Sequence, residues 1–154
     1  MSDSVNIKRV QSITDIKNSL HRFGSEMEDS LDRIEQAFRE VIDTLKNKLL
    51  SAKRELEQCI QSVKDAYEAL ENRENQADEE HTPDCSNEFE ELQNAKIEKR
   101  RAEEQLRKTQ RYCAMVEKQI LEYRSMAARM KKLTSYEVPQ ATAMLHGKIE
   151  TIGK

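Results

Sequence analysis

The residues whose chemistry is most specific in this chain are its three histidines and three cysteines. His81 and Cys85 lie four residues apart, a spacing that suits two ligands of one zinc ion. No other Cys or His is near them in the sequence, so they supply half of a site, and we expect a solvated loop; a metal bridging two chains stays open. His21 and His146 approach each other only if the end of the chain lies beside its beginning. We therefore predict no metal and no cofactor.

Catalysis would require groups that converge in a water-poor pocket. The sequence contains no phosphate-binding glycine loop and no nucleophile motif. We interpret the many carboxylates as a solvated face, and Tyr112, Tyr123 and Tyr136 as helix-packing or interface residues. These observations predict a protein that is not an enzyme and has no catalytic residue and no small-molecule substrate.

Charge is divided unevenly along the chain. Residues 1–95 hold 12 basic and 22 acidic side chains, whereas residues 96–132 hold 12 basic and 5 acidic ones. The basic segment has the charge to contact nucleic-acid phosphates. An acidic helix lying antiparallel to a basic one explains the same pattern. We favour this second interpretation because the pI is about 5.7 and no nucleic-acid-binding module surrounds the basic residues.

The composition indicates which elements must position these side chains. Charged residues make up 36% of the chain and aromatic residues 5%, with three Gly, two Pro and no Trp. Long helices have such a composition. In the first half, apolar residues recur every eleven positions, which keeps them on one side of a long helix. These two columns are Ile16, Met27, Phe38, Leu49 and Ile60, and Phe23, Ile34, Leu45, Leu56 and Tyr67.

The segment boundaries follow from capping and turn signals. Residues 1–11 are expected to be an arm, either extended or a frayed tail, and helix one to cover 12–72, with Ser12 and Asp15 at its start. Gly24 is compatible with a helix end, but the columns continue across it, which favours a kinked or continuous helix over a break. A polar turn covers 73–87.

Helix two is predicted over 88–134, with a start at Thr82 followed by Pro83, or at Asn87. Its apolar positions alternate spacings of three and four, a heptad seam. This seam comprises Leu92, Ala95, Lys99, Ala102, Leu106, Thr109, Cys113, Val116, Ile120, Tyr123, Ala127 and Met130.

Pro139 is expected to end or kink helix two and to push Val138 toward extended geometry. A short third helix over 138–152 then covers the start of helix one. The predicted fold is all-α: a long antiparallel two-helix hairpin, coiled-coil-like, with a short third helix folded back at the carboxyl terminus, in a single elongated domain over 1–154.

No apolar run approaches the roughly 18 residues that span a bilayer, and the first residues lack the features of a cleaved signal. Cys59, Cys85 and Cys113 form no close-spaced pair, which suits a reducing compartment. We expect a cytoplasmic protein with no membrane partner; export without a cleaved signal stays open.

Three segments carry a resemblance to known proteins. With the stretches Arg9-Val10-Gln11-Ser12-Ile13, Asp84-Cys85 and Gln110-Arg111-Tyr112, the chain resembles small bacterial helical proteins of secretion and polymorphic-toxin gene sets. The architecture is also similar to the helical-hairpin substrates and adaptors of type VII secretion, although their Trp-X-Gly turn is absent. The resemblance implies an adaptor or export partner and no catalytic residue.

Two helices do not bury all of the apolar surface of helix one. We expect the excess, at Leu20, Leu31, Ile42 and Leu50, to bind a protein partner. The leading function is therefore a non-enzymatic helical interaction module, a bacterial adaptor or chaperone-like partner of a secreted or toxin protein. A homo-oligomeric coiled-coil scaffold and a nucleic-acid-associated protein using helix two are the alternatives.

Overall fold

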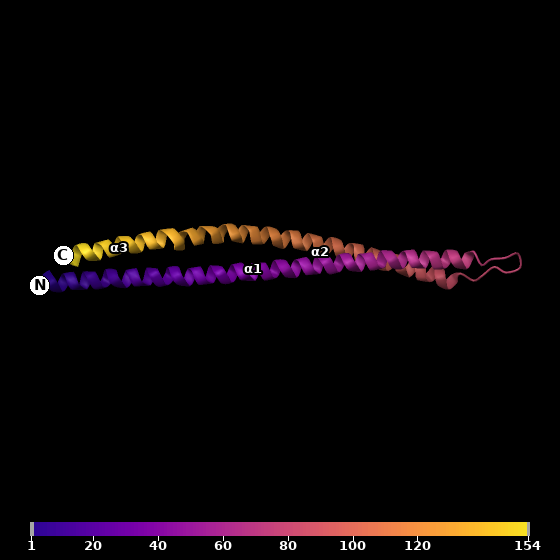
Figure 1. Cartoon of the computed structure of the whole chain (residues 1–154), viewed down its shortest axis with the longest axis horizontal. Helices are drawn as coiled ribbons and strands as arrows, with labels where there is room; N and C mark the ends of the chain where they lie inside the picture. Colours follow the sequence, from indigo (N-terminus) through magenta and orange to yellow (C-terminus); the bar gives the residue numbers. More distant parts are fainter. Residues whose placement is uncertain (1, 154) are drawn as a thin grey trace. The chain divides into compact units, whose positions relative to one another are not determined.

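The computed structural model describes residues 2–153, and nearly all of them are helical (Figure 1). Helix α1 covers Ser2–Glu74 and helix α2 covers Ser86–Lys132. A π-helical turn, η1, at Leu133–Glu137 leads directly into α3 at Val138–Gly153. No strand occurs in the described part of the chain. The predicted fold class is confirmed: an all-α antiparallel hairpin with a short third helix at its carboxyl end.

The contacts of the chain group into two compact units. Unit 1 comprises Met1–Glu40 and Gln119–Lys154, and unit 2 comprises Val41–Lys118. In unit 1 the first part of α1 lies beside the end of α2 and α3 (Figure 1). In unit 2 the chain reverses through residues 75–85 between α1 and α2. The single domain expected from the sequence stays a prediction.

The expected arm is wrong, because residues 2–11 form the first turns of α1; Met1 lies outside the described residues. Asp3 stabilises this helix start, since a carboxylate in the first turn interacts favourably with the helix dipole. Ile152 of α3 shares a shallow cavity with these turns, so they have an apolar neighbour. Ser12, the expected cap, instead donates its hydroxyl to the carbonyl one turn earlier, at 3.1 Å.

Helix α2 begins at Ser86, one residue before the expected start at Asn87 and after the alternative at Thr82. The Asp84 carboxylate accepts a hydrogen bond from the backbone N–H of Ser86 at 3.0 Å and another from its hydroxyl. These two bonds hold the pKa of Asp84 below its ordinary value. Asp84 is thus the side chain that accepts a hydrogen bond from a free backbone N–H group at the start of α2. The sequence patterns had assigned this role to Thr82 or Asn87.

The heptad seam predicted for helix two is confirmed in unit 2. Each of its positions in that unit is buried or half-buried, and the spacing of three and four continues without a gap. These positions are Leu92, Ala95, Lys99, Ala102, Leu106, Thr109, Cys113 and Val116.

The eleven-residue columns of helix one describe its buried side only in part. Ile16, Phe23, Ile34 and Tyr67 belong to these columns but remain 42–55% exposed. In unit 2, α1 instead buries a heptad seam, because only a helix with the same repeat stays in contact with α2. The small residues within this seam were not part of the columns. The seam comprises Ile42, Leu45, Leu49, Ala52, Leu56, Cys59, Val63, Ala66 and Leu70.

Helix α1 continues through Gly24 without a break, as the sequence favoured. Gly24 is buried, and a Cβ atom at this position would lie 3.2 Å from Cγ1 of Val138. The missing side chain therefore lets α1 and the start of α3 approach closely. The glycine serves helix packing within unit 1, and it ends no helix.

The extended geometry expected at Val138 is wrong. Its φ of −66° and ψ of −48° are helical, and its backbone N–H donates to the carbonyl of Leu133, five residues earlier. The wider π turn takes up the disruption that Pro139 causes, because proline lacks an N–H and crowds the preceding turn. The third helix is confirmed, and the π turn η1 joins it to α2 without a break in the helical backbone. Among the described residues, no helix combines the length and apolarity that a membrane span requires.

Candidate interaction face

The side chains with the most specific chemistry form no metal centre in the described residues, where no group of three or more His, Cys, Asp and Glu side chains is placed to hold an ion. His81 is exposed in the turn. Cys85 is half-buried, and its thiol donates to the carbonyl of Pro83 at 3.7 Å. Burial and the nearby Glu74 carboxylate raise the pKa of Cys85. A protonated thiol is a poor nucleophile and a poor metal ligand.

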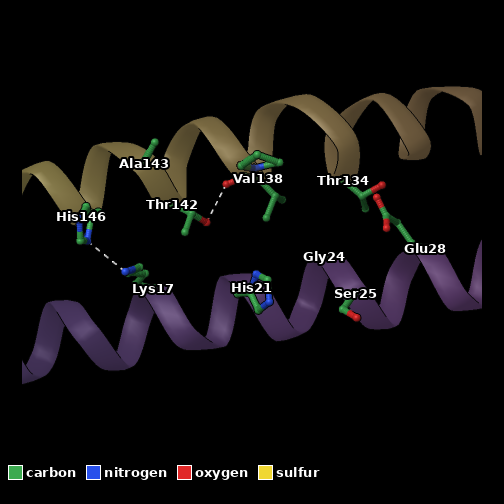
Figure 2. A pocket seen from close by; sticks show the side chains of 11 residues that line it. Lys17, His21, Gly24, Ser25, Glu28, Thr134, Val138, Thr142, Ala143 and His146 are labelled. Carbon is green, nitrogen blue, oxygen red and sulfur yellow. Dashed lines mark hydrogen bonds between the residues drawn. The ribbon is translucent and has the colours of Figure 1, made fainter.

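His21 and His146 both line a cavity of 620 Å³ in unit 1. Figure 2 shows this cavity between α1 and α3. Lys17 Nζ lies 3.1 Å from Nδ1 of His146, whose other ring nitrogen lies 3.2 Å from the Glu150 carboxylate. The contacts fix the position of α3 beside α1.

Some of the basic side chains of α2 form ion pairs within α2 itself. Lys108 lies 3.2 Å from Glu104, and Arg101 lies 2.7 Å from Glu98. Such pairs along one helix reduce the positive charge available to phosphates. The expected attraction between an acidic and a basic helix is represented in unit 1 by Glu35 and Arg124.

Glu35 and Arg124 form the ion pair that joins α1 to α2 in unit 1. Arg124 donates to both carboxylate oxygens, at 2.8 Å from Nη2 and 3.3 Å from Nε. The hydrogen bond from Arg124, together with the charge of Arg39, holds the pKa of Glu35 below its ordinary value of 4.5. Both partners are half-buried, so a planar bidentate pair occupies a place where the two helices face each other.

The four predicted partner-binding residues do not share one exposed surface. Leu20, Leu31 and Ile42 are half-buried. Leu31 lines a cavity beside Arg124 in unit 1, and Ile42 belongs to the heptad seam of unit 2. Leu50 is 47% exposed and lies in unit 2. Their role in partner binding stays a prediction.

Unit 1 instead exposes large apolar side chains along both of its helices. On α1 they follow a heptad spacing that runs beside the buried side of the helix and includes the half-buried Leu20 and Met27. On α2 they begin where the buried positions step from Ile120 to Arg124. We define the apolar face by Ile16, Phe23, Ile34, Tyr123, Met126 and Met130, which are 42–59% exposed.

A ring contact places the apolar residues of α1 and α2 on the same side of unit 1. The Phe38 ring, next in line after Ile34, stacks on Tyr123 with centroids 6.3 Å apart. The apolar stripes of α1 and α2 therefore meet along one side of unit 1.

The apolar pattern of the sequence includes residues of this face, but it assigned them to the buried heptad seam. Tyr123 and Met130 were assigned to the buried heptad of helix two, yet they are 58% and 45% exposed. Arg124 takes the half-buried position next to the other helix instead, and the apolar pattern did not identify it because it is charged. The apolar residues Tyr123 and Met130 therefore lie at the surface. No family model matches the chain, and neither a curated protein nor a solved structure similar to it was found.

Proposed function

We propose that this protein is a non-enzymatic helical interaction module that acts by docking the apolar face of unit 1 onto helices of a protein partner. The observation that supports it is the pair of exposed apolar stripes on α1 and α2, joined by the Phe38–Tyr123 stack. Two adjacent helices with apolar residues on the same side offer a groove for a further amphipathic helix, which inserts its own apolar residues between them.

The chemistry of the face suits a helical client. Met126 and Met130 are unbranched and flexible, so they adapt to side chains of different shapes. Tyr123 and Phe23 provide rigid anchors of the kind that dominate binding energies at interfaces. The resemblance to adaptors of secretion and toxin systems names the class of client that we propose: a helical segment of a secreted or toxin protein, bound by an adaptor or chaperone-like partner.

The experiment places a photo-crosslinking residue at Met130 of the full chain and, as a control, at Ile97, which is 45% exposed in unit 2. In the native cell, the probe at position 130 should link to a protein that the probe at position 97 does not reach. Binding of that purified protein should weaken with Met130→Asp and not with Ile97→Asp. Equal crosslinking at both positions, or binding that Met130→Asp does not weaken, would contradict the proposed function.

A further inference from the structure

We infer that a second copy of this chain covers the apolar face, with α1 of one copy antiparallel to α1 of the other. This inference rests on the proposed function, because it concerns the same surface, and it names the occupant of that surface in the protein without its client. The pairing makes a four-helix arrangement from two copies of unit 1, related by a two-fold axis across the helices.

The exposed area of the face is of the size that a specific interface uses. With about 200 Å² for a fully exposed large side chain, the six residues of the face together expose roughly 600 Å². The half-buried Leu20 and Met27 add to this area. Specific protein interfaces bury about 600–1,000 Å² per partner, so a second copy that covers the whole face reaches the lower part of this range.

The apolar stripe of α1 is complementary to the same stripe on a second, antiparallel copy of α1. About the point between Glu28 and Asp29, Phe23 and Ile34 lie at equal separations on the two sides, and so do Met27 and Ser30. Two antiparallel copies centred there place each Phe23 opposite Ile34 of the other copy. The large Met27 then faces the small Ser30, which is the complementarity that helix packing requires.

The charges at the outer edge of this stripe are complementary in the same register. Glu26 and Arg33 are both exposed, and neither has an ion-pair partner among the described residues. In the antiparallel pair, Glu26 of each copy lies two residues, about 3 Å along the axis, from the point opposite Arg33 of the other copy. Two equivalent pairs of opposite charge therefore flank the apolar contact and select this direction and register.

The exposed apolar residues on α2 lie near the two-fold axis that this pairing of α1 defines. The contact of Gly24 with Val138 and that of Glu35 with Arg124 bracket the centre of the α1 pairing. Met130 lies between these two contacts along the chain, so it is close to the two-fold axis and faces the partner copy. Tyr123 and Met126 then extend the apolar contact to one side of the axis.

The experiment measures the mass of the full chain in solution by sedimentation equilibrium, with circular dichroism as a check on helix content. We expect a dimer. Ile34→Asp should raise the dimer dissociation constant by about tenfold or more, since it puts a charge in the apolar contact. The matched control Ile97→Asp replaces a residue of the same type, 45% against 44% exposed, in unit 2 and should leave the dimer unchanged.

Charge exchange tests the register. Glu26→Arg alone and Arg33→Glu alone each place like charges together twice and should weaken the dimer, whereas the double variant should restore it. A dimer that resists Ile34→Asp, or that the double exchange does not restore, overturns the inference. A monomer that binds an identified helical partner through Met130 also overturns it and leaves the proposed function intact, while a monomer that binds neither overturns both.

Discussion

The ion pair of Glu35 with Arg124 ties α1 to α2 in unit 1 and makes its stability depend on pH. Because Arg124 and Arg39 lower the pKa of Glu35, the folded state favours the carboxylate more than the unfolded chain does. This contribution is fully present above the ordinary pKa of 4.5 and is lost as the pH falls through the lowered value.

Glu35→Gln should therefore lower the melting temperature at neutral pH, and the deficit should disappear in acid. Thermal unfolding followed by circular dichroism between pH 7 and pH 2 measures this, with Glu57→Gln, an exposed position on the same helix, as the control. A deficit that persists unchanged below the lowered pKa would show that Glu35 acts by packing and not by charge.

Gly24 marks a close contact between α1 and α3 that the sequence alone does not predict. Its hypothetical Cβ lies 3.2 Å from Val138, a branched side chain that is 8% exposed and has little rotamer freedom. Gly147, in contrast, has open space around the same position. The two glycines are thus a matched pair, both in helices and different only in what they touch.

Gly147→Ala should stabilise the protein by up to about 1 kcal/mol through helix propensity, whereas Gly24→Ala should give no such gain because the new methyl group presses on Val138. Adding Val138→Ala should relieve the pressure. Chemical denaturation of the four proteins decides the matter; an equal gain at both glycines would mean that α1 and α3 lie further apart at Gly24.

At the scale of the helices, the seams of α1 and α2 in unit 2 carry the packing. Leu45 is 5% exposed, and its carbonyl lies 3.8 Å from the thiol of Cys113, whereas Leu50, five residues later, is 47% exposed. Leu45→Ala should therefore cost about 2–5 kcal/mol of unfolding free energy, and Leu50→Ala roughly 0.5 kcal/mol or less. Urea denaturation of both variants tests the assignment, and similar losses at the two positions would mean that the buried side of α1 has been misplaced.

The helices were predictable because their composition and the absence of breaks over long stretches leave few alternatives. The heptad of α2 was also predictable, since its spacing is regular from Leu92 to Val116. The seam of α1 was not, because Ala52, Cys59 and Ala66 carry a weak apolar signal and the exposed Phe23 and Ile34 a strong one. Burial in a helix pair depends on the partner's repeat, which no single helix contains.

For the whole molecule, the apolar face arises where both helices carry more apolar surface than their mutual contact covers. That excess leaves Tyr123, Met126 and Met130 outside the buried seam, with Tyr123 stacked on Phe38. The sequence predicted an excess of apolar surface on helix one but did not place any of it on helix two, since the step from Ile120 to Arg124 becomes visible only when the two helices are paired.

Methionine oxidation tests most directly whether this face is covered in solution. Met126, Met130 and Met115 are 59%, 45% and 51% exposed in the isolated chain, and Met115 lies in unit 2, so their rates of oxidation by peroxide should be similar if nothing covers them. We expect mass spectrometry to show Met126 and Met130 oxidising more slowly than Met115 in the wild-type protein, and this difference to vanish in Ile34→Asp. Equal rates at all three methionines in the wild-type protein would contradict the account.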